Sequence, residues 1–295
     1  MKKVIVILGP TAVGKTKISI EIAKHYNLDI ISGDSVSIYK ELNIGSAKPT
    51  ISEMQGVKHY LIDIKEPNEM YSVCDFQKDS RKIIDNNELS LISGGTGLYI
   101  KACLCNYEFE NKERDKSFED KYKDLSNQEL YDLLLKLDNN IDKSKLHPNN
   151  RKRVLRALEV YYDTNKSIHD FNKKDEYLYD YYICYLSMDR NKLYDRINKR
   201  VDLMIKDGLI DEVKALYDKK IYPHAIGYQE FIPYFQGKMS LEDSIELIKK
   251  NTRHLAKRQE TWFRNQMDSH FYIVNDDINI TINEIINDID KWKDK

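Results

Sequence analysis

The chain has 295 residues, of which 41% are hydrophobic and 32% charged, and its formal net charge is −1. This composition excludes a disordered or collagen-like chain and a globally basic nucleic-acid binder of the histone type, but it leaves room for local basic patches. The 4 cysteines are too scattered for a disulfide scaffold or a four-ligand zinc site, and no signal peptide or stretch of 18 apolar residues occurs, so we expect a soluble, cytoplasmic, globular protein with no membrane segment.

Short apolar runs alternate with helix-length amphipathic segments over the first hundred residues. We predict helices from about Lys15, from a capping box at Ser72 and Asp75 to about Asn87, and after Gly97. We predict strands at Val4–Leu8, Leu28–Ser32, Tyr60–Ile64 and Leu89–Ser93. Strands separated by helix-length segments indicate an α/β fold with a parallel sheet and helices on both faces.

The segment that follows Asn106 is rich in charged residues and asparagine and contains no convincing strand. Helices are expected near Gln128–Asp138 and Arg151–Asp163, and strand character returns at Tyr181–Leu186. We therefore predict a core domain formed by residues 1–106 and 179–295, interrupted by an all-helical insertion domain, residues 107–178.

The C-terminal third reads as mainly helical. A helix after Asp189 is expected to stop at Gly208, and Ser240 is expected to cap a long final helix that reaches about Met267. The tail from Asp268 carries 7 acidic residues and 3 lysines, a net charge of −4, and we predict that it packs loosely.

A glycine-rich motif follows the first buried strand and opens the first helix. It fits the pattern G-x-x-x-x-G-K-[ST] of a phosphate-binding loop, with both neighbouring elements in the required places. Its amides and helix N-terminus attract an anion, Lys15 adds a point charge, and the Thr16 hydroxyl can complete a magnesium shell. The predicted fold is therefore that of the phosphate-loop NTPases, with a loop made of Gly9, Pro10, Thr11, Ala12, Val13, Gly14, Lys15 and Thr16.

One acidic residue has a clear position for chemistry next to this loop. Asp34 follows the predicted strand Leu28–Ser32, and Thr96 follows Leu89–Ser93. Because ligands bind outside the carboxyl ends of parallel strands, both residues are expected to face the phosphate loop. The alternative for Asp34 is that it only caps a short helix running toward Leu42.

Two clusters of basic residues stand out from the neutral chain. Residues 145–166 hold six cations and two acids, and a second stripe runs along the last helix at Lys250, Arg253, Lys257 and Arg264. Each stripe alone is typical of a solvated face, but together with a phosphate loop they favour a polyanionic partner. Arg196 and Arg200 either reach the phosphate site or pair with Asp195 or Glu212, and the sequence leaves this open.

Several ordered motifs make the chain resemble the bacterial tRNA dimethylallyltransferases from end to end. They are GPTAVGKT (Gly9–Thr16), ISGDSVSIYKELNIGSAKP (Ile31–Pro49), SGGTGLYIKA (Ser93–Ala102), HPNNRKRVLRALEV (His147–Val160), RINKRVDLMIKDGLIDEV (Arg196–Val213), HAIGYQE (His224–Glu230) and TRHLAKRQETWFR (Thr252–Arg264). The first motif occurs in many phosphate-loop proteins, whereas the ordered set is specific to this family.

The resemblance implies transfer of a dimethylallyl group from dimethylallyl diphosphate to N6 of adenosine 37 in tRNAs that read codons beginning with U. The phosphate loop would then hold the donor diphosphate instead of ATP, with Mg²⁺ on Thr16. Lys15, Thr16, Arg153 and Arg200 would assist departure of the diphosphate and closure of the site, and Asp34 would accept the proton. The residues implied to contact the tRNA anticodon stem-loop are Asp34, Ser35, Val36, Ser37, Thr96, Lys152, Arg153, Val154, Leu155 and Arg156.

Some features depart from the family pattern. Ser37 stands where glutamine is common, Ser46 stands where threonine is common, and Tyr107–Phe118 lacks the expected character at the start of the insertion. No apolar patch suggests a large interface, so we expect a monomer. The alternatives are a nucleotide or small-molecule kinase, an isopentenyltransferase acting on free AMP or ATP, and a non-enzymatic phosphate-loop RNA-binding module.

Overall fold

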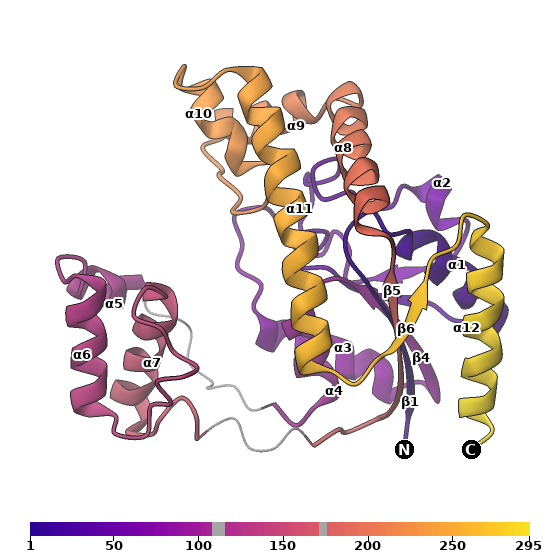
Figure 1. Ribbon diagram of the computed structural model, residues 1–295, viewed down its shortest axis with the longest axis horizontal. Helices are drawn as coiled ribbons and strands as arrows, with labels where there is room; N and C mark the ends of the chain where they lie inside the picture. The colour runs from indigo at the N-terminus through magenta and orange to yellow at the C-terminus, as the bar shows by residue number, and fades with distance from the viewer. Residues whose placement is uncertain (108–115, 171–175) are drawn as a thin grey trace. The chain divides into compact units, whose positions relative to one another are not determined.

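The computed structural model of the chain describes residues 1–107, 116–170 and 176–295 (Figure 1). The chain forms two compact units, Met1–Leu104 with Leu178–Lys295, and Cys105–Tyr177. We refer to them as unit 1 and unit 2. Among the described residues, no helix is long and apolar enough to cross a membrane.

Unit 1 is built on one sheet in which all strand pairs are parallel, in the order β3-β2-β4-β1-β5-β6. Its strands are β1 (Lys3–Leu8), β2 (Ile30–Gly33), β3 (His59–Tyr60), β4 (Leu89–Gly94), β5 (Asp180–Ser187) and β6 (His270–Ile273). In this register Leu8 pairs with Gly94, which also pairs with Gly33. The carboxyl ends of β1, β2 and β4 are therefore level, and the segments that follow them meet at one edge of the sheet.

Helices cover both faces of this sheet, because the apolar runs of its central strands must be buried on both sides. The helices of unit 1 are α1 (Lys15–Tyr26), α2 (Ile51–Met54), α3 (Val73–Asp85), α4 (Gly97–Leu104), α8 (Arg190–Lys206), α9 (Leu209–Asp218), α10 (Ile232–Phe235), α11 (Leu241–Gln266) and α12 (Ile278–Lys293), with the 3-10 turn Gln229–Phe231. Figure 1 shows α1 and α12 on one side of the strands and α11 on the other. The predicted α/β fold with a parallel sheet is thus confirmed.

The prediction for the C-terminal tail was wrong. Residues from His270 add β6 to the sheet edge beside β5, and α12 packs against α1. Isoleucines 282, 285 and 289 of α12 lie in the main core with Ile5 and Ile7 of β1. The three isoleucines of α12, together with Ile278, recur at helical spacing and form an apolar stripe. This stripe, and not the net charge of the segment, decides that the helix packs against the core.

Two smaller predictions also differ from the structure. Only His59 and Tyr60 of the third predicted strand pair with β2, because Leu61 and Asp63 adopt left-handed φ values of 62° and 55°. No helix forms between Asp34 and Leu42 in this described stretch, which folds as a series of turns instead.

Unit 2 contains α5 (Lys116–Lys121), α6 (Asn127–Leu137) and α7 (Arg151–Thr164). Its small core is formed mainly by α6 and α7, with Leu130, Leu134, Val154 and Leu158 fully buried. Ser126 begins α6 with a capping box to Glu129, which satisfies two backbone amides at the helix start. Residues 108–115 of the divergent segment Tyr107–Phe118 lie outside the described residues.

Candidate active site

The phosphate loop joins β1 to α1 and curls around the ammonium group of Lys15. Lys15 Nζ donates hydrogen bonds to the carbonyls of Gly9 at 2.9 Å and Pro10 at 2.8 Å. Gly14 precedes α1 with φ 111°, a conformation that favours glycine. A side chain at Gly9 would place its Cβ 2.8 Å from the Leu186 carbonyl, so the loop passes close to β5. These contacts hold the loop at the carboxyl end of β1, close to β5.

Two cations are crowded together at this loop. Burial of the ammonium group, and then the nearby guanidinium of Arg200, lower the pKa of Lys15 to about 8. Burial also lowers the pKa of Arg200. Arg200 donates from Nη1 to Thr11 Oγ1 and from Nη2 to the Ala47 carbonyl, each at 3.5 Å. Charged groups that raise each other's energy in this way are suited to bind an anion, which relieves the repulsion.

Asp34 lies at the end of β2 and serves a turn and the cavity at the same time. Its Oδ1 accepts hydrogen bonds from the amides of Val36 at 2.8 Å and Ser37 at 3.2 Å. Thr96 supports the same turn, since its Oγ1 accepts from the Ser35 amide at 3.1 Å. Asp34 therefore caps a turn in place of the short helix considered from the sequence, and this contact uses one carboxylate oxygen. Asp34 also lines a cavity at the carboxyl end of the sheet.

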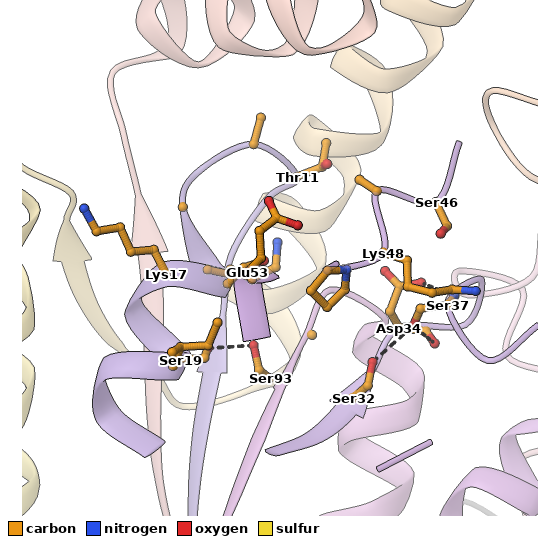
Figure 2. A pocket seen from close by; sticks show the side chains of 18 of the residues that line it. Thr11, Lys17, Ser19, Ser32, Asp34, Ser37, Ser46, Lys48, Glu53 and Ser93 are labelled. Atoms are coloured by element: carbon orange, nitrogen blue, oxygen red, sulfur yellow. Dashed lines mark hydrogen bonds between the residues drawn. The ribbon is translucent and has the colours of Figure 1, made fainter. Parts of the chain in front are cut away.

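A cavity of about 580 Å³ lies entirely within unit 1 at the carboxyl end of the sheet (Figure 2). Its walls bring together Thr11, Gly14, Lys15, Thr16, Asp34 and Arg200 from the predicted site. Arg196 lines the same cavity, and among the described residues neither Arg196 nor Arg200 forms an ion pair with Asp195 or Glu212. The two arginines thus face the phosphate site.

Several lining residues were not singled out from the sequence: Lys17, Lys48, Glu53, His59 and Lys199. Six lining residues are cationic and two are acidic, so the cavity is positive overall. Lys48 is held by Asp63, the Asn43 side chain and the Tyr39 carbonyl. The Thr50–Glu53 capping box that forms α2 was a readable signal for Glu53.

The oxygens near the loop fit a magnesium ion held mainly by substrate. Thr16 is exposed in the first turn of α1, and it lines the cavity together with Asp34. Within the described ranges, no group of three or more His, Cys, Asp or Glu side chains is placed to hold a metal. Mg²⁺ commonly uses one or two protein oxygens plus phosphates and water, and the Thr16 hydroxyl and the Asp34 carboxylate could supply such oxygens.

The predicted residues of α7 divide by exposure. Lys152 and Arg153 are exposed on the surface of unit 2, and Arg156 pairs with the buried Glu159 at 2.8 Å. The side chains of Val154 and Leu155 belong to the core of unit 2. In the stretch 152–156, therefore, the exposed residues are Lys152 and Arg153.

A phosphate loop between the buried strand β1 and a helix, with an acid at the end of β2, two strands away in the same sheet, defines a phosphate-loop protein built to act on a phosphorylated ligand. Residues 37–266 match the family model described as IPP transferase, and residues 2–69 match the one described as isopentenyl transferase. The chain belongs to the IPP transferase family, and it is a transferase.

Similar proteins span nearly the whole chain. The tRNA dimethylallyltransferase of Enterococcus faecalis is 47% identical over 92% of both chains, and that of Anoxybacillus flavithermus is 44% identical over 98% of this chain and 96% of its own. The solved tRNA isopentenylpyrophosphate transferase of Bacillus halodurans is 41% identical, with a TM-score of 0.76 over 99% of this chain and 97% of that one. A eukaryotic dimethylallyltransferase solved acting on tRNA is 29% identical, with a TM-score of 0.81 over 94% of this chain and 75% of that one. The family predicted from the motifs is confirmed.

Proposed function

We propose that the protein transfers the dimethylallyl group of dimethylallyl diphosphate to N6 of adenosine 37 in tRNAs that read codons beginning with U. The products are N6-(dimethylallyl)adenosine in the RNA and free diphosphate. The observation that carries this proposal is the single cavity that holds Lys15, Arg200 and the Asp34 carboxylate. Cations for a departing diphosphate and an acceptor for a proton thus stand in one place.

Cleavage of the bond between the allylic carbon and the diphosphate oxygen is the easier half of the reaction. This bond breaks readily because the cation that develops is stabilised by resonance, so the site must mainly neutralise the departing diphosphate. The phosphate-loop amides, Lys15 and Arg200 supply that charge. Mg²⁺ held by Thr16 and the phosphate oxygens would add Lewis-acid stabilisation of the same group. Arg153 of unit 2 is proposed to assist closure of the site.

Attack by the adenine N6 amine on the allylic carbon is the harder half of the reaction, because an exocyclic amine is a weak nucleophile. The base must leave the anticodon loop to reach the cavity and lie in line with the allylic carbon. As the new N–C bond forms, Asp34 accepts a proton from N6. We propose that residues 34–37, Thr96 and the exposed side chains of Lys152 and Arg153 contact the tRNA anticodon stem-loop, and that unit 2 is an RNA-contacting domain. Val154 and Leu155 are buried, and Arg156 is paired with Glu159, so they are not proposed as contacts. We also propose that the enzyme works as a cytoplasmic monomer.

Mass spectrometry of the RNA product tests this function. Purified protein, Mg²⁺ and dimethylallyl diphosphate would be incubated with an anticodon stem-loop carrying three adenosines at positions 36 to 38, with AMP and ATP as parallel acceptors. We expect adenosine in the RNA alone to gain one C5H8 unit. Modified AMP or ATP, or ADP formed from ATP, would support the isopentenyltransferase acting on free nucleotides or the kinase instead.

A further inference from the structure

Three of the sequence motifs contain residues that have no role in the proposed chemistry, and the structure joins these residues at one carboxylate. Glu212 of α9 comes from the stretch Arg196–Val213, the loop Asn43–Gly45 from Ile31–Pro49, and Tyr228 from His224–Glu230. Glu212 is half-buried between the other two. All three stretches lie in unit 1.

The Glu212 carboxylate accepts hydrogen bonds from three successive backbone amides. Oε2 accepts from Asn43 at 3.0 Å and from Ile44 at 2.9 Å, and Oε1 accepts from Gly45 at 3.1 Å. Tyr228 donates its hydroxyl to Oε1 at 2.7 Å. Hydrogen bonds to an ionised acceptor are stronger than neutral ones, so this carboxylate fixes the loop firmly.

The packing around the carboxylate leaves the loop little freedom. Tyr228 is buried, and burial together with the Glu212 carboxylate raises its pKa, so its hydroxyl stays protonated and donates. A Cβ on Gly45 would lie 2.5 Å from the Tyr228 ring, which shows how closely the loop approaches it. Ile44 packs against the cluster that contains Tyr228, Leu209 and Val213.

The clamped loop continues directly into the wall of the active site. Ser46, Ala47, Lys48 and Pro49 line the cavity. The Ala47 carbonyl accepts from Arg200, whose other nitrogen donates to Thr11 of the phosphate loop. A continuous set of contacts therefore runs from Glu212, through the loop and Arg200, to the phosphate loop.

We propose that Glu212 is a positioning residue for the donor diphosphate, acting through residues 43–47 to hold Arg200 against the phosphate loop. This inference rests on the proposed function, because the donor is the ligand whose binding it explains. Glu212 itself lies outside the lining of the cavity and is not assigned a catalytic role.

Replacing Glu212 by Gln tests the proposal, because the amide keeps the shape but turns one acceptor into a donor that faces the backbone N–H groups. We expect the KM for dimethylallyl diphosphate to rise on the order of tenfold, with a smaller change in kcat, because the lost interaction serves ground-state binding. The Kd of the anticodon stem-loop should stay at the wild-type value. The matched control is Asp211→Asn, which removes one negative charge at the exposed neighbouring residue of α9. It should leave the donor KM and the Kd of the stem-loop unchanged.

A double-mutant cycle with Arg200→Ala separates positioning from general stability. If Glu212 acts through Arg200, adding Glu212→Gln to Arg200→Ala raises the donor KM no further. Independent, additive effects would overturn the proposal, as would an unchanged donor KM in folded Glu212→Gln.

Tyr228→Phe provides a milder variant should Glu212→Gln fail to fold. It removes one hydroxyl donor and leaves the three amides in place, so a rise in donor KM of about threefold is expected, equivalent to the lower range for one hydrogen bond. An unchanged KM in Tyr228→Phe would then count against the proposal. Absence of turnover in the wild-type enzyme would reject the proposed function instead, so the two failures are distinguishable.

Discussion

Gln259 of α11 accepts a hydrogen bond from the backbone amide of Thr11 in the phosphate loop, over 3.2 Å. Its amide nitrogen donates to the Gly95 carbonyl at 3.0 Å. A Cβ at Gly95 would lie 2.5 Å from that nitrogen, so glycine is needed there for the contact. A residue far along the chain thus fastens the phosphate loop to the turn that follows β4.

Replacing Gln259 by Ala removes both hydrogen bonds. We expect the free energy of unfolding to fall by roughly 1–3 kcal/mol, because the Gly95 carbonyl is buried and loses its partner. We also expect weaker diphosphate binding, since the loop loses its support at Thr11. Denaturant titration and calorimetric titration with inorganic diphosphate measure the two effects. Unchanged values for both would show that the contact holds nothing in place.

Replacing Asp34 by Asn separates its two roles. The Asn side-chain oxygen can still accept from the amides of Val36 and Ser37, so the turn should persist and RNA binding should stay near the wild-type value. The amide cannot accept the N6 proton, so turnover should fall by about 10²- to 10⁴-fold. Single-turnover rates and binding to the stem-loop provide the measurement. Wild-type turnover would assign Asp34 to the turn alone.

The lowered pKa of Lys15 predicts that donor binding depends on pH. With its pKa lowered to about 8, Lys15 is charged below that pH in the free enzyme and loses its proton as the pH rises through it. Donor affinity should therefore decline above pH 8, by up to about tenfold per pH unit. Donor Kd between pH 6.5 and 9.5 tests this, with Lys15→Arg as the control, because its guanidinium stays charged over the whole range. A flat wild-type profile would contradict it.

The same lowered pKa affects folding in the opposite direction: the free energy of unfolding should rise with pH where donor affinity declines. Between the folded value of about 8 and the ordinary value of 10.5, the unfolded chain binds more protons at Lys15 than the folded one. The contribution of Lys15 to the free energy of unfolding therefore rises with pH across this window. Comparing wild type with Lys15→Met over the same pH range isolates that contribution.

Replacing the exposed cations of α7 should change the salt dependence of RNA binding, whereas replacing Arg156 should not. Lys152→Ala and Arg153→Ala are each expected to reduce the slope of log affinity for the stem-loop against log salt by about one unit, as expected for one lost phosphate contact. Arg156→Ala removes an ion pair to Glu159 and should mainly reduce stability. Binding isotherms from 50 to 300 mM salt measure the slope. Unchanged slopes in both surface variants would show that Lys152 and Arg153 contact solvent and not RNA phosphates.

Truncation in α12 tests whether the C-terminal segment is part of the core. Ile285 is fully buried among residues of α1 and the sheet, so Ile285→Ala should cost about 2–5 kcal/mol of unfolding free energy. Ile280→Ala in the same helix is the control, because Ile280 is half exposed. Equal, small losses in both variants would indicate a loosely attached tail.

The central strands of the sheet and the phosphate loop could be predicted because those signals are local, whereas β6 was not predicted and the third predicted strand formed only at His59 and Tyr60. A buried β-branched run, a glycine-rich turn and a helix follow one another between Val4 and Tyr26, and no distant contact is needed to interpret them. The carboxyl-end rule then placed Asp34 correctly at the cavity. Of the described helices of unit 2, α6 and α7 were predicted close to their observed bounds, whereas the short helix α5 was not predicted.

The parts that sequence reasoning missed depend on contacts between distant segments. Glu212, Tyr228 and Gly45 are separated along the chain and meet only once α9 packs beside the loop. The tail was misjudged because its net charge was given more weight than the spacing of four isoleucines. Charge describes the exposed face of a helix, whereas burial is decided by the other face.

The two ends of unit 2 lie side by side, and so do the ends of unit 1 that flank it. Cys105 and Tyr177 form an antiparallel bridge, and the Leu178 amide donates to the Leu104 carbonyl at 2.8 Å. A chain that leaves and returns at neighbouring points adds a module without disturbing the strand order around it, much as a hairpin loop does. β5 still pairs with β1 as if α4 led to it directly. The register of β5 against β1 therefore does not depend on the length of unit 2, because the chain re-enters the core where it left it.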